Sequence, residues 1–380
     1  MIDVATRRIA VVGGGVIGLA CAWRIAQRVP CEVTLIDPDP GAGASAVGAG
    51  MLAPLTEAHP TEPDLLELAL DSAARFPAFA ADLAAASGLD PGYETAGTLA
   101  VALTADDRAA LGVLAGHLAA AGRDTELLGS RALRNLEPAL APGVRGGLRV
   151  DGDHSVDNRA LLRSLRRAAD RAGVRFVADQ ALAITDSGDR VTGVRLVGGA
   201  HQRADVVVAA AGCWSAGLHP ALAGLIRPVK GEIIRLRARA GVVRPQRTLR
   251  ATVDGRSVYL VPRSSGELVV GATQYEAGFD TSVSAGAVHA LLSDARAVLP
   301  GIDEYELTEA RAGLRPGSRD NAPLIGPIGP AGLVAATGHH RNGILLAPVT
   351  ADAITDFLID GHLPRFAEAA AAARFQTVRR

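Results

Sequence analysis

The segment RRIAVVGGGVIGLACAWRIAQRVPCEVTLIDP, residues 7–38, decides the fold. Residues 9–12 form a short apolar run that predicts a buried parallel strand, and the pattern that follows predicts a helix as far as about Arg28. Residues 32–36 predict a second strand, which Asp37 closes. The segment therefore predicts a strand–helix–strand unit of a parallel sheet.

The turn between the first strand and the helix carries Gly13, Gly15 and Gly18 in the pattern G-x-G-x-x-G. Gly13 permits the tight turn, Gly15 lets the backbone approach a pyrophosphate, and Gly18 lets the helix pack on the strand. The helix N-terminus offers unpaired N–H groups to phosphates. Asp37 stands nineteen residues after Gly18 and is expected to accept hydrogen bonds from both ribose hydroxyls. A dinucleotide site is expected, with NAD and FAD both open at this point.

Composition narrows the class of protein. The chain has 380 residues, 48% apolar and 21% charged, which is typical of a globular protein of one large or two medium domains. Its formal net charge of −1 argues against a nucleic-acid or anionic-membrane partner, which would require a basic face. Lys230 is the single lysine, so an arginine is weaker evidence of function in this chain than usual.

The three cysteines, Cys21, Cys31 and Cys213, lack metal-ligand spacing and predict free thiols in a reducing compartment. No metal site is therefore expected. The N-terminal apolar run is interrupted by glycines, which does not fit a signal peptide, and no run reaches the length of a membrane span. We expect a cytoplasmic protein.

The segment 41–54 consists of small residues with neither helical nor strand period, which suits backbone lying against a flat ligand, with a flexible linker as the alternative. A buried parallel strand is predicted within residues 204–215, ending in a close backbone approach at Gly212. Further patterns predict helices at 62–87, 104–122, 159–172, 284–299 and after Pro348, strands at 97–103, 174–184, 305–318 and 332–338, and a polar turn at 151–158.

Residues 226–272 differ from the rest because they hold short alternating strands with glycine turns, which predicts an antiparallel sheet. The predicted class is α/β, with an antiparallel-sheet substrate domain inserted into a discontinuous Rossmann-type cofactor domain. We place the cofactor domain at 1–90, 150–225 and 318–362, and the substrate domain at 91–149 and 226–317. An alanine-rich C-terminal tail, 363–380, has no predicted role.

Seven segments, in order along nearly the whole chain, resemble the glycine oxidase branch of the D-amino-acid oxidase family of flavoproteins. They are VVGGGVIGLA (11–20), ASAVGAGMLAP (44–54), VVVAAAGCWS (206–215), PVKGE (228–232), VYLVPRSSGELVVGAT (258–273), AGLRPGSRDNAPLIG (312–326) and GHHRNGILLAP (338–348). The resemblance implies FAD bound without a covalent link and oxidation of a small amine or amino acid. It implies that flavin N5 takes hydride from the substrate α-carbon, water hydrolyses the imine, and oxygen reoxidises the flavin to give H2O2. With glycine, the imine is expected to serve thiazole synthesis in thiamine formation.

The resemblance also implies which residues contact the cofactor, with no catalytic side chain beyond the flavin. In addition to the glycines above and Asp37, the implied contacts are Val16, Ile17, Ala44, Ser45, Ala49, Gly50, Met51, Val177, His339, His340, Arg341, Asn342, Gly343, Ile344 and Leu345.

Tyr259, Arg315 and Arg341 match the positions that hold the substrate carboxylate. A guanidinium matches a carboxylate in a two-pronged geometry, and a phenol hydroxyl can add a third bond. A structural role is the alternative for each of the three.

Three positions depart from the family pattern or are ambiguous. His340 stands where an aromatic is usual, and packing is its expected role. Gln274 stands where the resemblance implies a methionine in the pocket wall, which leaves the preferred substrate shape open. Lys230 could either activate oxygen or cap the end of a strand.

Several functions stay open. They are oxidation of sarcosine or a small D-amino acid, a dehydrogenase that passes electrons to another acceptor, and a non-catalytic flavin-binding subunit. The expected partners are a small amino acid and O2, with a homo-oligomer such as a tetramer and a functional link to thiazole synthase as further expectations.

Overall fold

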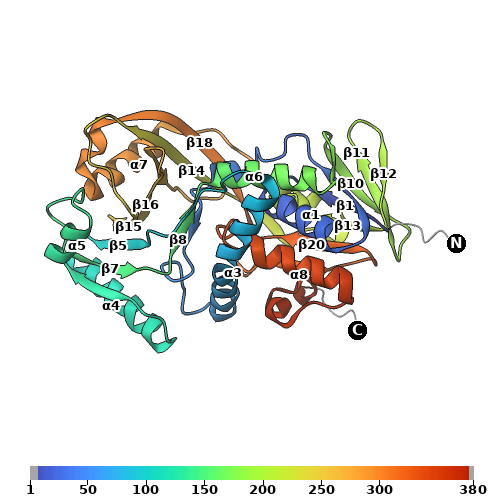
Figure 1. Ribbon diagram of the computed structural model, residues 1–380, viewed down its shortest axis with the longest axis horizontal. Helices are drawn as coiled ribbons and strands as arrows, with labels where there is room; N and C mark the ends of the chain where they lie inside the picture. Colours follow the sequence, from blue (N-terminus) through green and yellow to red (C-terminus); the bar gives the residue numbers. More distant parts are fainter. Residues whose placement is uncertain (1–6, 376–380) are drawn as a thin grey trace.

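The computed structural model describes residues 7–375, in which two β-sheets lie side by side along the long axis (Figure 1). One is a six-stranded sheet in the order β19-β20-β13-β1-β2-β9. All neighbouring strands are parallel except β19, which pairs antiparallel with β20. The strands are β1 (Arg7–Val12), β2 (Cys31–Ile36), β9 (Arg175–Val177), β13 (Val206–Ala209), β19 (Leu324–Pro327) and β20 (Leu333–Thr337).

The alternation of β1 side chains explains how both faces of this sheet are buried. Ile9 and Val11 pack against the helical face, whereas Ala10 and Val12 pack against the opposite face. The helical face is covered by α1 (Val16–Arg28), α3 (Pro63–Ser87), α6 (Asn158–Arg171) and α8 (Ala347–Asp360). A small antiparallel sheet of β10 (Ala181–Asp186), β11 (Val191–Leu196) and β12 (His201–Arg203) packs on the other face.

The second sheet has eight strands in the order β18-β14-β17-β16-β15-β5-β7-β6. Neighbours are antiparallel apart from the parallel pair β15–β5. The strands are β5 (Thr98–Ala102), β6 (Glu126–Gly129), β7 (Gly146–Val150), β14 (Ile226–Ala238), β15 (Thr248–Val253), β16 (Arg256–Pro262), β17 (Glu267–Gly271) and β18 (Tyr305–Ser318). The helices of this lobe are α4 (Ala105–Ala120), α5 (Ser130–Leu136) and α7 (Ala285–Val298). The α/β class with an antiparallel second sheet is confirmed.

Helix starts follow the expected capping chemistry. The Thr104 side chain accepts a bond from the Asp107 N–H, and the Asp107 carboxylate accepts one from the Thr104 N–H, a capping box that begins α4. Asp157 caps α6 and Ser284 caps α7 in the same way, each through its side-chain oxygen.

The predicted single strand at 174–184 is wrong, because the chain turns after Val177 and supplies β9 to one sheet and β10 to another. The Asp179 N–H donates to the Val177 carbonyl, and the Asp179 side chain accepts from the Gln180 N–H, which closes the turn.

Two further segments hold more structure than predicted. The small-residue segment contains α2 (Ala44–Val47) and β3 (Met51–Leu52), and the polar turn contains β8 (His154–Val156). Strand β8 pairs with both β3 and β4 (Tyr93–Glu94). Partner strands distant in sequence therefore order both segments.

The alanine-rich segment is packed against the fold as far as the structure describes it. Short 3-10 helices span Arg365–Ala370 and Ala372–Phe375, and Ala367 and Ala372 are fully buried. Residues 376–380 of the predicted tail lie outside the described residues. Between residues 7 and 375, no helix combines the length and apolarity needed to cross a bilayer.

Candidate functional site

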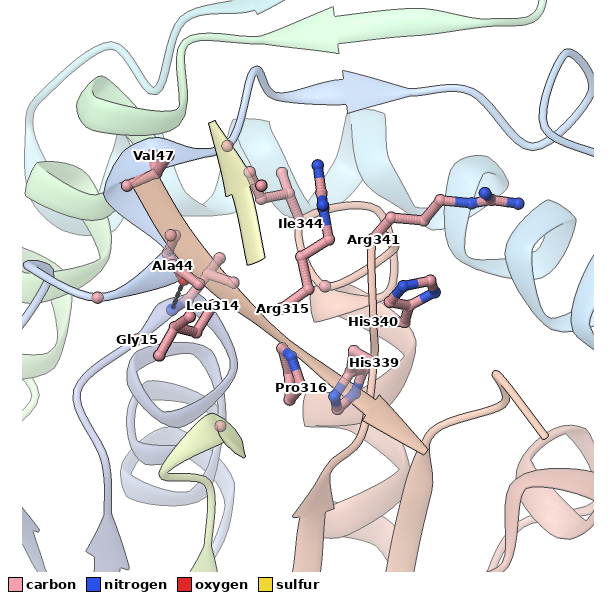
Figure 2. A pocket seen from close by; sticks show the side chains of 18 of the residues that line it. Gly15, Ala44, Val47, Leu314, Arg315, Pro316, His339, His340, Arg341 and Ile344 are labelled. Atoms are coloured by element: carbon pink, nitrogen blue, oxygen red, sulfur yellow. Dashed lines mark hydrogen bonds between the residues drawn. The ribbon is translucent and has the colours of Figure 1, made fainter. Parts of the chain in front are cut away.

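A cavity of about 1140 Å³ runs from the N-terminus of α1 to the inner face of the eight-stranded sheet. Both sheets contribute to its walls, and its volume suits a ligand of dinucleotide size better than a single small metabolite. Figure 2 shows its centre, where Gly15 and Ala44 lie on one side and Arg315, His340 and Arg341 on the other.

The glycine turn of the first motif forms one end of this cavity. Gly13 has φ +107°, and a Cβ at this position would collide with the carbonyl of Ala210, the residue after β13. A Cβ on Gly18 would collide with the Gly13 carbonyl, so Gly18 serves helix packing and does not line the cavity. Only glycine satisfies both positions. The N-terminus of α1 therefore opens directly into the cavity.

Gly15, Val16 and Ile17 line this end of the cavity, and Ser45 lies opposite them. The Ser45 hydroxyl accepts a hydrogen bond of 3.0 Å from the Val16 N–H. A hydroxyl at the first N–H groups of a helix marks the position at which phosphate oxygens bind in dinucleotide sites.

Asp37 also lines the cavity, at the end of β2. One carboxylate oxygen accepts the Gly14 N–H at 2.7 Å and the other accepts the Asp39 N–H at 2.8 Å. These two bonds hold the carboxylate beside the glycine turn, where the ribose is predicted to bind.

The segment 44–51 lies along the cavity, and buried side chains hold it from behind. The Arg263 guanidinium donates to the Ala49 carbonyl, and the Asn158 amide donates to the Ser45 carbonyl at 2.7 Å. Gly50 has φ +75°, and a Cβ there would collide with the Val156 carbonyl. The predicted contacts Ala44, Ser45, Ala49, Gly50 and Met51 all line the cavity, as does Gly212. Sequence reasoning did not find Arg263 and Asn158, because neither touches the cavity.

Val177, for which the resemblance implies a cofactor contact, is not among the residues that line the cavity. Its carbonyl accepts the N–H groups of Asp37, at 3.1 Å, and Asp179, at 3.0 Å. Gln180 and Ala181, which follow the turn at Asp179, do line the cavity. The contact implied for Val177 therefore stays a prediction.

The segment GHHRNGILLAP passes from β20 to α8 along the cavity floor. His339 to Ile344 line the cavity, whereas Leu345 is buried in the helical core and does not. His339 is hydrogen-bonded through Nε2 to Thr350 Oγ1 at 2.9 Å, and burial lowers its pKa to about 3. The first histidine therefore holds the segment as a neutral side chain.

His340 lines the cavity, although packing was its expected role. It has φ +48°, and its N–H donates to the Pro316 carbonyl at 2.8 Å, which joins this segment to β18. Burial, helped by the charges of Arg315 and Arg341, lowers the pKa of His340 to about 4. A neutral imidazole thus borders the cationic end of the cavity (Figure 2).

Tyr259, Arg315 and Arg341 all line this same end, as the resemblance implies. Glycines on neighbouring strands leave room for two of them: a Cβ on Gly231 would overlap the Arg315 guanidinium, and one on Gly271 would overlap the Tyr259 ring. Burial raises the pKa of Tyr259, against the opposing charge of Arg315, so the phenol stays protonated and able to donate.

Two residues of this end, Glu57 and Arg250, were not predicted. Glu57 Oε1 lies 2.6 Å from Arg250 Nη1, and Glu57 Oε2 lies 2.9 Å from Arg341 Nε. Burial alone would raise the pKa of Glu57, but Arg250 and Arg341 outweigh it and lower that pKa. The pair joins residues almost two hundred positions apart, and no sequence pattern marks such a contact.

The Lys230 ammonium lies 5.5 Å from the ring centroid of Tyr275, a residue that lines the cavity. The buried ammonium lies 2.5 Å from Asp280 Oδ2 and 3.9 Å from Glu232 Oε1, and Lys230 does not itself line the cavity. These contacts hold the segment between β17 and α7 against β14, which favours a structural role.

The chain matches the model of a family described as DAO, FAD dependent oxidoreductase, over residues 8–357. It is 34% identical over 357 residues to a glycine oxidase of Geobacillus kaustophilus, covering 92% of each chain. A solved structure of glycine oxidase from Geobacillus kaustophilus superposes with a TM-score of 0.88 at 33% identity, covering 97% of this chain and 99% of that one. It is also 33% identical over 375 residues to a bifunctional protein ThiO/ThiG of Synechocystis, covering 98% of this chain. The chain spans only 54% of that relative's length.

Proposed function

Because the chain belongs to the DAO family of FAD-dependent oxidoreductases, we propose that it oxidises glycine and other small amines or amino acids with bound FAD. One observation carries the proposal. Tyr259, Arg315 and Arg341 meet at one end of a cavity whose other end is the N-terminus of α1. A carboxylate-binding end and a phosphate-binding end thus share one cavity, as a dinucleotide-dependent amino-acid oxidase requires.

The residues present fit FAD. Gly13, Gly15 and the first N–H groups of α1 would hold the pyrophosphate, and Asp37 would hold the ribose. The segments 44–51 and 339–344 would lie beside the rings, since both line the cavity between its two ends. Cys21, Cys31 and Cys213 do not line the cavity, which supports binding without a covalent link.

When bound, FAD supplies the acceptor for the hydride that leaves the substrate α-carbon. The side chains of this protein bind and orient the substrate. Arg315 and Tyr259 hold its carboxylate, while Arg341, kept in place by Glu57, adds a second positive charge. His339 and His340 are neutral because burial lowers the pKa of each, so neither competes as a cation for the carboxylate. The imine that forms would hydrolyse to glyoxylate and ammonia with glycine, and H2O2 would be the other product.

We further propose that the imine serves thiazole synthesis in thiamine formation, with a functional link to thiazole synthase. The likeness to one part of a bifunctional ThiO/ThiG protein supports this, because that relative carries a matching region and a further region in one chain. A cytoplasmic location and assembly into a homo-oligomer remain parts of the same proposal.

The main alternative keeps the family and changes the substrate to sarcosine or a small D-amino acid, in an oxidase or a dehydrogenase. A non-catalytic flavin-binding subunit is the other alternative, but it would have no need for Tyr259, Arg315 and Arg341 at one cavity end. Their convergence therefore favours an enzyme.

Peroxide release separates these candidates. The FAD-loaded protein is supplied in air with glycine, sarcosine, N-ethylglycine, D-alanine or D-proline, and parallel samples receive a dye acceptor under nitrogen. Peroxide with glycine supports the proposal, while turnover only with the dye supports a dehydrogenase. Absence of turnover with every compound under both conditions would overturn the assignment as an amino-acid oxidase.

A further inference from the structure

The carboxylate-binding end of the cavity contains a cation, Arg250, that the proposed reaction does not use. Arg250 on β15 is the direct cross-strand partner of Tyr259 on β16. Directly opposed residues of an antiparallel pair project from the same face of the sheet, and both line the cavity. The Arg250 side chain is only 20% exposed. A guanidinium this far removed from water requires anionic or polar partners.

Protein partners engage only one nitrogen of that guanidinium. Arg250 Nη1 contacts Glu57 Oε1 at 2.6 Å and the Met51 sulfur at 3.7 Å. Within residues 7–375, Nε and Nη2 of Arg250 make no hydrogen bond to the protein. An arginine carries five N–H donors in a planar fork. Most of the Arg250 donors therefore remain available to a ligand.

The acids nearby do not saturate the cations. Glu57 divides its two oxygens between Arg250 and Arg341. Arg315 makes no ion pair with any carboxylate among the described residues, and its Nη1 donates to two backbone carbonyls. The buried carboxyl of Asp153 accepts bonds only from the backbone and the hydroxyl of residues 55–56. Four guanidinium groups border the cavity, and Asp294 engages that of Arg256. Among the described residues, Glu57 is the one carboxylate that pairs with any of the other three.

Another residue that lines the cavity is polar as well. Gln274 is exposed, and its side-chain amide bonds no other residue that the structure describes. An amide and a guanidinium in the lining of one cavity suit an acid group that accepts several hydrogen bonds.

We propose that Arg250, with Glu57 beside it, forms a second anion subsite, so that the substrates include amines carrying a second acid group. The inference rests on the proposed function, in which Arg315 and Tyr259 hold the first carboxylate. The second acid group would bond the free donors of Arg250, while Glu57 keeps its contact with Arg341. The second acid group could be attached either to the substrate nitrogen or to the substrate side chain. Both would offer the same hydrogen-bond acceptors to Arg250.

The test compares pairs of substrates that differ only in the second acid group. For acid on the nitrogen, the pair is N-carboxymethylglycine and N-ethylglycine; for acid on the side chain, it is D-aspartate and D-alanine. For each pair, the measured quantity is the ratio of kcat/KM for the diacid to kcat/KM for the monoacid. In Arg250→Met, this ratio should be about tenfold or more lower than in the wild type for at least one pair. The pair that shows this change identifies where the second acid group lies.

Arg256→Met is the matched control. Arg256 borders the same cavity, but Asp294 engages it through two bonds of 3.0 and 2.7 Å. This variant should leave the diacid-to-monoacid ratio as in the wild type. A ratio that is the same in wild type, Arg250→Met and Arg256→Met for both pairs would overturn the proposal.

A binding measurement tests the subsite independently of turnover. Malonate and acetate are titrated calorimetrically into the FAD-loaded protein, and malonate should bind about tenfold more tightly, an advantage that Arg250→Met removes. If Arg250→Met does not fold, Arg250→Lys should still reduce the advantage, because an ammonium lacks the planar fork. Malonate binding no tighter than acetate in the wild type contradicts the subsite. Absence of flavin reduction by every amine contradicts the proposed function instead, and the titration then still decides whether the subsite exists.

Discussion

The guanidinium of Arg315 on β18 lies against Gly231 on β14, with no space between them for a Cβ. Its Nη1 donates to the Lys230 and Thr273 carbonyls at 3.4 and 3.2 Å, which fixes the direction of the fork. The absence of a side chain at Gly231 thus determines where Arg315 is predicted to hold the substrate carboxylate.

Gly231→Ala is therefore expected to raise the KM for amino acids. The new methyl group would displace the guanidinium at the flexible end of Arg315. Binding of the substrate carboxylate should therefore weaken while the protein still folds. A displacement of about an ångström at a binding group costs on the order of 10–100-fold in catalytic efficiency. Steady-state kinetics with the best substrate measures the effect. Gly286→Ala on α7 is the control, since a Cβ there meets no atom within 4 Å. An unchanged KM in Gly231→Ala would show that Arg315 does not grip the substrate.

Arg341 is predicted to affect substrate binding far more than cofactor binding, although the resemblance places it beside both. Its side chain is 42% exposed and pairs with Glu57, so Arg341→Ala removes a partly solvated charge from the carboxylate end. We expect KM to rise about tenfold, while the dissociation constant of FAD, measured by flavin fluorescence, changes by less than about threefold. Equal losses of substrate and FAD affinity would place Arg341 against the cofactor.

Substitution of Lys230 tests whether this residue activates oxygen or has a structural role. Its ammonium is engaged by Asp280, and Lys230 does not itself line the cavity. In Lys230→Met, the rate constant for reoxidation of the reduced protein by O2, measured by stopped flow, should stay within about twofold of wild type. The thermal midpoint should fall, because Asp280 loses its partner. A drop in reoxidation of about a hundredfold would instead assign oxygen activation to Lys230.

The parts of the fold that were predictable carry local signals. The strand, glycine turn and acid of residues 7–38 are contiguous, and strands β14 and β18 are long, with 13 and 14 residues. Strands β6 and β7 were missed because they have five residues or fewer, and β15 was missed although it forms a hairpin with β16. Their existence follows from pairing, which a single sequence does not display.

The site divides in the same way. Arg315 and Arg341 stand in recognisable motifs, so their positions could be predicted before their contacts were known. The ion pair between Glu57 and Arg250 crosses two segments with no shared pattern. The turn at Asp179 ends β9 at Val177, so that Gln180 and Ala181 line the cavity and Val177 does not, and no local pattern announces that turn.

Asp153 offers a prediction on stability. It is completely buried, and its carboxylate accepts the N–H groups of Leu55 and Thr56 and the Thr56 hydroxyl, which positions the turn that carries Glu57. Burial raises its pKa from 3.8 to about 6, against the opposing effect of these bonds. Between those two pH values the folded state therefore binds a proton that the unfolded state has released.

The sign of the pH effect follows from that difference. The contribution of Asp153 to stability is fully present below pH 3.8 and is lost as the pH rises through about 6. The pKa moves by about two units, and the unfolded carboxyl is already partly ionised at pH 4, so the wild type should lose about 2 kcal/mol relative to Asp153→Asn between pH 4 and pH 7. Urea unfolding at a series of pH values measures the difference, and subtraction of the two curves removes the titrations that both proteins share. Asp106→Asn, at an exposed position on α4, should show no such change. Parallel curves for wild type and Asp153→Asn would mean that Asp153 titrates alike in the folded and unfolded chain, and that the turn carrying Glu57 is held by an ordinary carboxylate.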